Sequence, residues 1–76
     1  MDQKKLVKMA NEIAAFFAAD PDRKVALEGI ATHLKKFWEP RMRRAIFEAL
    51  DAGGAGMSEH TRDALTVHRQ QLTPAS

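Results

Sequence analysis

The chain has 76 residues and a mass of 8.5 kDa, which allows one small domain with a thin hydrophobic core. Hydrophobic residues make up 45% and charged residues 29% of it, and the net charge of +2 is small for a dedicated nucleic-acid binder. Cysteine is absent, which excludes disulfides, thiolate nucleophiles and cysteine-bound zinc. A domain this small that lacks such staples often depends on a partner.

Membrane and export signals are not apparent in the sequence. The longest stretches without a charge, among them Ile13 to Ala19, are far shorter than the roughly 20 residues that a membrane helix needs. The first residues do not resemble a signal peptide, because no apolar region or cleavage site follows them. We therefore expect a cytoplasmic protein that does not bind membranes.

The first expected helix spans residues 3–19. Its apolar side chains recur at steps of four and three residues, which is typical of an amphipathic helix. This stripe consists of Leu6, Ala10, Ile13 and Phe17, with Met9 and Phe16 widening it.

The second expected helix spans residues 21–38, with Asp20 as N-cap and Pro21 as its first residue. Its apolar stripe consists of Leu27, Ile30, Leu34 and Phe37, flanked by Ala31 and Trp38. Gly29 interrupts this helix and indicates a point of close helix approach.

Two further helices are expected after Pro40. The third spans residues 40–52 and ends where Gly53 or Gly54 takes a left-handed C-cap conformation. The fourth begins after Ser58 as N-cap and runs to about Gln71. Its apolar stripe is weaker than the others, so we expect it to pack less firmly.

These segments predict an all-α fold, a small bundle of three to four short helices. We expect a single domain at residues 1–72 and a disordered tail at residues 73–76. The expected core consists of Leu6, Ile13, Phe17, Leu27, Ile30, Leu34, Phe37, Ile46 and Leu50.

No catalytic or metal-binding pattern emerges from the sequence. His33 is expected to flank the core, and His60 and His68 are too far apart for a one-turn pair of metal ligands. The glycines at residues 53–56 follow a helix and lack the lysine of a phosphate loop, so a turn between helices is favoured. We therefore predict a non-enzyme with no catalytic residues, no metal site and no cofactor.

One segment stands out as a candidate binding site. Residues 37–44 contain the single tryptophan and three of the arginines, residue types that dominate interaction hot spots. Arginines in the first turn of a helix oppose its dipole, which suggests a partner that compensates for them. The predicted partner-binding residues are Trp38, Glu39, Arg41, Met42, Arg43 and Arg44. A solvated basic helix start beside a core tryptophan is the competing interpretation.

Three blocks of residues carry a resemblance to a known family. They are Lys8–Ile13 with Phe16 and Phe17; His33 and Leu34 with Phe37–Arg43; and Asp51–Gly54 with Gly56–Ser58, Arg62, Ala64 and Leu65. Over about residues 6–65 the chain resembles the delta subunit of soluble, molybdenum-containing, NAD-dependent formate dehydrogenases. Glu39 stands where many relatives have aspartate, and the residues after Val67 resemble nothing in the family.

The resemblance implies an accessory role in assembly or stability of the enzyme complex. It also implies that the molybdenum cofactor, iron–sulfur clusters and flavin belong to larger subunits, of which the molybdenum-binding catalytic subunit is the expected partner. The alternative is a small helical nucleic-acid-binding module that uses the Arg41–Arg44 cluster. Self-association of the bundle is a third possibility.

Overall fold

The computed structural model describes residues 2–75, and within that range it contains five helices and no strand. They are α1 (Gln3–Phe17), α2 (Arg23–Phe37), α3 (Pro40–Asp51), α4 (Glu59–Val67) and α5 (Arg69–Leu72). The predicted all-α class and small-bundle architecture are therefore confirmed. The parts of the expected domain and tail that fall on residues 1 and 76 lie outside the described range. None of the helices in residues 2–75 is long and apolar enough to cross a membrane.

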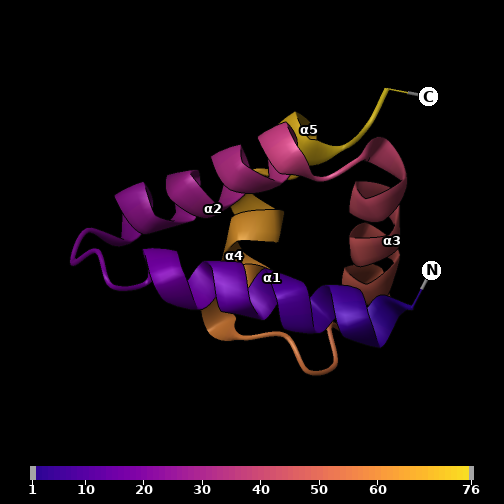
Figure 1. Cartoon of the computed structure of the whole chain (residues 1–76), viewed down its shortest axis with the longest axis horizontal. Helices are drawn as coiled ribbons and strands as arrows, with labels where there is room; N and C mark the ends of the chain where they lie inside the picture. Colours follow the sequence, from indigo (N-terminus) through magenta and orange to yellow (C-terminus); the bar gives the residue numbers. More distant parts are fainter. Residues whose placement is uncertain (1, 76) are drawn as a thin grey trace.

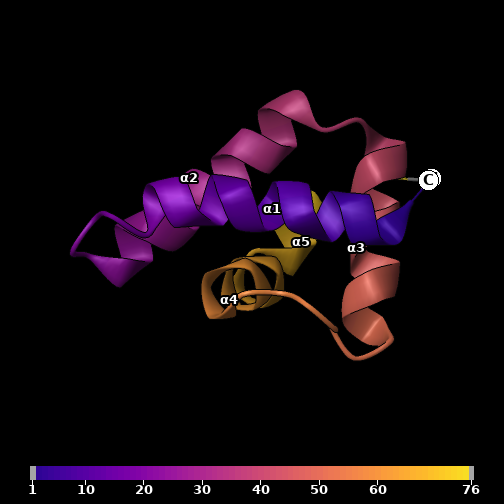
Figure 2. The same ribbon diagram turned by 60° about the horizontal axis from the view of Figure 1, so that its bottom comes forward.

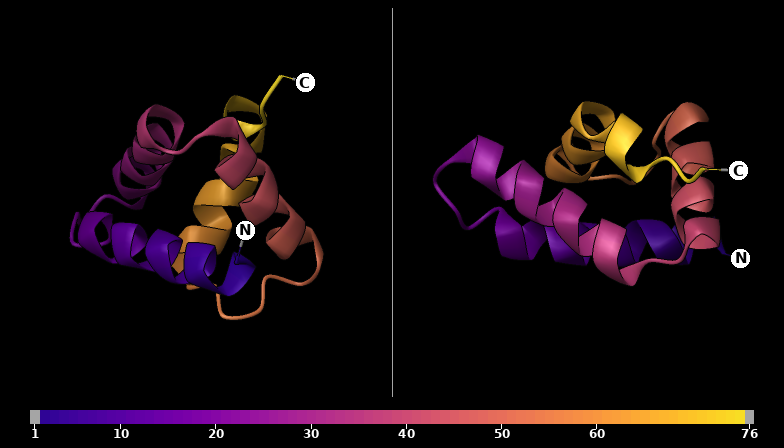
Figure 3. Two further views of the ribbon diagram at one scale, coloured as in Figure 1. Left: turned by 45° about the vertical axis from the view of Figure 1, so that its right-hand side comes forward. Right: turned by 90° about the horizontal axis from the view of Figure 1, so that it is seen from above.

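The helices are arranged in two layers (Figure 1). The first layer is the antiparallel pair α1 and α2, and the second consists of α4 and α5, which pack against it. Helix α3 stands across one end and contacts α1 and α4. Figures 2 and 3 show that α4 and α5 lie on one side of the α1–α2 pair, so its other side is not covered by any described helix.

The turn between α1 and α2 differs from the expectation at the start of α2. Asp22, not Asp20, is the N-cap, and its side chain accepts hydrogen bonds from the backbone N–H groups of Lys24 and Val25. The Asp20 carboxylate instead accepts a hydrogen bond from the Asp22 N–H, at 2.8 Å. This local turn keeps Pro21 outside the helix, which begins at Arg23.

The break between α2 and α3 determines which aromatic side chain enters the core. Trp38 and Glu39 have extended backbones, as expected for residues that precede Pro40. Trp38 lies one helical turn after Leu34 and its side chain is buried, whereas Phe37 is 69% exposed. The prediction that Phe37 belongs to the core is therefore wrong, because Trp38 fills the core position at this end of α2.

The rest of the predicted core is confirmed, and it is larger than predicted. Leu6, Leu27, Ile30, Leu34 and Ile46 are buried, while Ile13, Phe17 and Leu50 are half-buried and pack against them. The remaining buried apolar residues that contact this cluster are Val7, Ala10, Ala14, Ala31, Trp38, Phe47, Met57, Ala64, Leu65 and Leu72. Small alanines on α1 and α2 allow the helices to approach closely.

The close approach predicted at Gly29 is confirmed. A Cβ atom at this position would overlap the Phe17 ring, which occupies the space beside Gly29. Gly29 is thus required by packing between α1 and α2 rather than by backbone conformation.

A polar cluster joins the connection between α3 and α4 to helix α1. Gly53 and Gly54 have positive φ angles of 121° and 67°, which ends α3 as predicted. Asn11 on α1 donates to the Gly56 carbonyl at 2.8 Å and accepts from the Ser58 N–H and the Thr61 hydroxyl, each at 2.9 Å. Ser58 is the N-cap of α4, as predicted.

The last part of the chain packs more firmly than expected. The predicted fourth helix is divided at His68 into α4 and α5. Ala64, Leu65 and Leu72 are completely buried, so the prediction of weak packing is wrong. Leu65 and Leu72, one on each side of the break at His68, are both buried in the core.

Candidate functional site

The structure separates the predicted partner-binding residues into an interior and a surface group. Trp38 and Arg43 are only 5% and 7% exposed, so both side chains lie inside the fold. Glu39, Arg41 and Arg44 are exposed, and Met42 is half-buried with its side chain against the core. The segment is therefore partly a core element and partly a solvent-exposed surface.

The Arg43 side chain forms hydrogen bonds with two separate parts of the chain at the α2–α3 corner. Its Nε donates to the Trp38 carbonyl at 3.3 Å, and its Nη1 donates to the Leu72 carbonyl, at the end of α5, at 3.0 Å. These carbonyls lie at helix ends, where the helical ladder leaves acceptors unsatisfied. Arg43 thus connects α5 to the α2–α3 corner, a structural role that the sequence does not reveal.

The surface that remains at this corner carries two arginines and one acid. Arg41 and Arg44 are exposed whereas Arg43 is buried, and the helical period places them about 200° and about 100° around α3 from Arg43. Arg41 forms an ion pair with Glu39, with 3.5 Å between Nη2 and Oε2, and both side chains are well exposed. Such a pair is weak in water and can be exchanged for a partner's carboxylate.

A second surface, which the sequence does not predict, lies on the uncovered side of α1 and α2. Phe16 is 75% exposed and Phe37 is 69% exposed. They lie at the two ends of a row of rings, in which the centroid distances are 5.1 Å for Phe16–Phe17, 6.3 Å for Phe17–His33 and 4.8 Å for His33–Phe37. We call this surface the aromatic face; it consists of Met9, Ile13, Phe16, Phe17, His33 and Phe37.

Two open hollows adjoin each other on the aromatic face and share Phe17 and His33. One has a volume of about 300 Å³ and is lined by Glu12, Ile13, Phe16, Phe17 and His33. The other has a volume of about 390 Å³ and extends along α2 from Val25 to Phe37. Together they form a shallow groove over the aromatic face. It begins between α1 and His33 and continues along the surface of α2, which supplies the whole lining of the second hollow except Phe17. The adjacent phenylalanines at residues 16 and 17 are the one sequence signal for it, because a single helix face cannot bury both.

Several charged side chains of the described residues form contacts between helices. No group of three or more His, Cys, Asp or Glu residues in residues 2–75 is placed to hold a metal ion. Arg69 donates two hydrogen bonds to Asp51, at 2.8 and 2.7 Å, and lowers the pKa of that carboxyl. Its guanidinium also lies over the Phe47 ring, 4.8 Å from the centroid.

A second ion-pair cluster joins α2 to α4. Arg23 pairs with Asp63 and, at 3.0 Å, with Glu59, and the hydrogen bond to Asp63 is the main reason that the pKa of Arg23 is raised. Nε2 of His60 lies 3.5 Å from the same guanidinium. Two of the three histidines therefore contact neighbouring side chains. His60 lies at this cluster, and the His33 ring lies between those of Phe17 and Phe37.

Comparison with known families identifies the chain. The family model described as "NADH-dependant formate dehydrogenase delta subunit FdsD" matches residues 5–65. The chain belongs to this family. No curated protein and no solved structure matches it significantly. The resemblance found in the sequence is thus confirmed.

The matched range includes both surfaces. Residues 5–65 of this FdsD chain include the aromatic face, the exposed arginines of α3 and most of α4. The matched range ends before α5, whose Leu72 is buried in the core and accepts a hydrogen bond from Arg43 through its backbone carbonyl.

Proposed function

We propose that this FdsD chain is a non-catalytic accessory subunit that supports assembly or stability of a cytoplasmic, NAD-dependent, molybdenum-containing formate dehydrogenase. The family match over residues 5–65 is the observation that carries the proposal. The contacts of three arginines also support it, because Arg23, Arg43 and Arg69 each connect one helix to another part of the fold.

The proposed partner is a larger formate dehydrogenase subunit, in particular the one that binds molybdenum. At the α2–α3 corner, Arg41 and Arg44 are available to bind its carboxylates, since arginine forms two parallel hydrogen bonds to such groups. Glu39 and the exposed edge of Met42 belong to the same contact. Trp38 and Arg43 contribute indirectly, because the hydrogen bond between them fixes the corner of the backbone that carries these side chains.

The nucleic-acid-binding alternative has less support than the sequence suggested. Burial of Arg43 removes one of the three arginines from the proposed basic surface, and Arg41 already pairs with Glu39. Phosphate contacts would require several exposed cations on one side. No observation in the structure favours this alternative over the accessory role.

Co-purification tests the proposal. The tagged chain, co-expressed with the larger formate dehydrogenase subunits, should recover them. The double variant Arg41→Glu/Arg44→Glu should recover less, because each reversed charge would face a carboxylate. Lys24→Glu on α2 is the matched charge-reversal control, since Lys24 is also exposed. Failure of the parent chain to recover any larger subunit would contradict the accessory role. Full recovery by the double variant would show that Arg41 and Arg44 do not belong to the interface.

A further inference from the structure

We infer that the aromatic face is the main docking surface of this subunit and receives an amphipathic helix of a larger formate dehydrogenase subunit. The inference rests on the proposed function and deepens it, because it assigns the apolar centre of the interface to α1 and α2. The α2–α3 corner would then contribute a charged contact separate from this centre.

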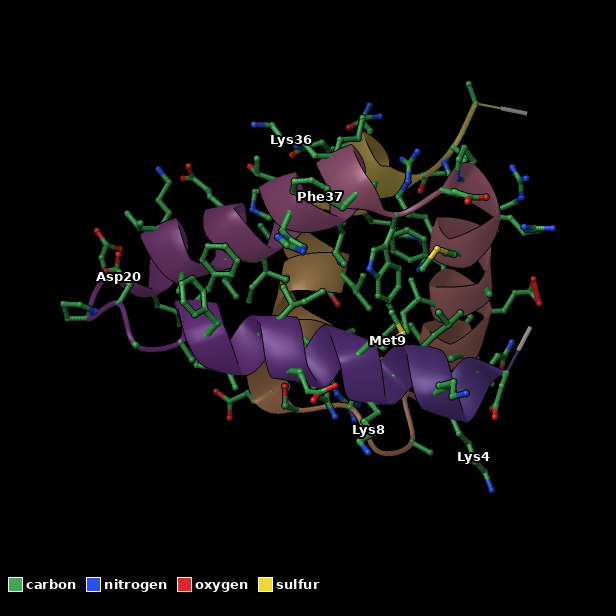
Figure 4. All side chains as sticks on the ribbon, in the orientation of Figure 1. Lys4, Lys8, Met9, Asp20, Lys36 and Phe37 are labelled. Atoms are coloured by element: carbon green, nitrogen blue, oxygen red, sulfur yellow. The ribbon has the colours of Figure 1, made fainter. Side chains whose placement is uncertain are left out.

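The face is apolar, contiguous and uncovered. Figure 4 shows Phe37 and Met9 on the side of the α1–α2 pair that faces away from α4. At about 200 Å² for a whole side chain, the exposed fractions of Phe16 and Phe37 correspond to roughly 300 Å² of aromatic surface. A patch of this size matches the largest apolar patch on a typical monomer, which is often functional, whereas single exposed hydrophobic residues need no explanation.

The area of the patch fits a heteromeric partner better than a second copy of the chain. A standard interface buries about 800 Å² on each partner, of which about 57% is non-polar, or roughly 450 Å². The two phenylalanines, the 38% exposed Met9 and the groove floor supply most of that. Obligate homodimers bury larger and more apolar surfaces than this face offers.

The shape of the face matches a helix. The groove is elongated, because its two hollows meet at Phe17 and His33, with Phe16 lining the hollow on α1 and Phe37 lining the hollow along α2. An amphipathic helix fits such a groove by inserting apolar side chains at one-turn spacing.

The charges along the groove indicate the orientation of that helix. Glu12 and Glu28 line it toward the α1–α2 turn, and Lys36 lines it toward the opposite end (Figure 4 labels Asp20 at the turn and Lys36). Within residues 2–75 these three side chains form no ion pair. Since the N-terminus of a helix is positive and its C-terminus negative, the bound helix should start near the turn and end near Lys36.

The test compares two apolar surfaces of the same chain. Phe16→Ser/Phe37→Ser removes both exposed rings, and Val67→Ser, on α4, removes a 65% exposed apolar side chain from elsewhere. Each tagged variant is co-expressed with the larger subunits, and its melting curve and mass are measured alone. We expect the double variant to recover at least tenfold less of the larger subunits while melting close to the parent, and Val67→Ser to behave as the parent.

The possible results distinguish this inference from the proposed function. If the parent and the double variant recover the larger subunits equally, the aromatic face is not the docking surface, although the accessory role stands. If the parent recovers none, the proposed function fails and the inference with it. If the isolated parent forms a dimer that the double variant abolishes, a second copy covers the face and the inference is overturned. Should the double variant unfold, Met9→Glu, which inserts a charge into the same face, must show the tenfold loss instead.

Discussion

Replacement of Arg43 by methionine separates folding from binding at the α2–α3 corner. Methionine keeps the apolar stem of the side chain but removes the hydrogen bonds to the carbonyls of Trp38 and Leu72. Arg44→Met is the matched control, because it makes the same chemical change one residue later, where the side chain is exposed.

The expected loss of stability follows from these two contacts. Hydrogen bonds from a charged donor contribute about 1.5 to 3 kcal/mol each, and removing the buried charge returns part of this because its desolvation is relieved. A net loss of about 2 to 4 kcal/mol is expected, from a total that for 76 residues is roughly 4 to 11 kcal/mol. The melting temperature should fall by roughly 10 to 25 °C, since each kcal/mol corresponds to about 4 to 8 °C in a domain of this size.

The assay is thermal unfolding followed by circular dichroism at 222 nm. Arg43→Met should melt well below the parent, and Arg44→Met should melt within about 3 °C of it, because exposed substitutions usually cost under about 0.5 kcal/mol. If both variants melt like the parent, Arg43 does not connect α5 to the corner. If Arg43→Met then also fails to recover the larger subunits, Arg43 is an interface residue, as the sequence suggested.

Two further predictions concern contacts between helices. Asn11→Ala should lower the free energy of unfolding by about 2 to 4 kcal/mol in urea titration, because it removes three hydrogen bonds to the α3–α4 connection, whereas its exposed neighbour Glu12→Ala should have little effect. Arg69 lowers the pKa of Asp51, so their pair stabilises the fold above the unfolded pKa of about 3.9 and is lost as the pH falls through the lower folded value. Asp51→Asn should therefore melt slightly below the parent at pH 7, and the difference should vanish in acid; a constant difference at all pH values would contradict this.

Local patterns in the sequence predict most of the helices and part of the core. The stripe of Leu6, Ile13, Leu27, Ile30 and Leu34 depends only on helical spacing, and all five side chains are buried or pack against the core. The glycine end of α3 and the Ser58 cap of α4 follow from backbone preferences that act within a few residues.

The errors arise where a bend of the backbone or a contact distant in sequence decides between two local options. Phe37 and Trp38 are both suited to end the apolar stripe of α2, and the extended backbone before Pro40 places Trp38 inside. Arg43 resembles its exposed neighbours until Leu72, 29 residues later, supplies a carbonyl for it. The aromatic face appears only when α1 and α2 are packed, because Phe17 and His33 then connect the exposed rings of Phe16 and Phe37 in one row.

The central claim, that this FdsD chain supports a formate dehydrogenase without taking part in its chemistry, is tested most directly by preparing the enzyme with and without it. The measurement is formate-dependent NAD reduction per assembled complex, together with the yield of complex and its half-life on heating. The account predicts a lower yield or a shorter half-life without the chain, and an unchanged rate for each complex that does assemble. A complex that assembles in full and is equally stable without the chain, but reduces NAD far more slowly, would contradict it.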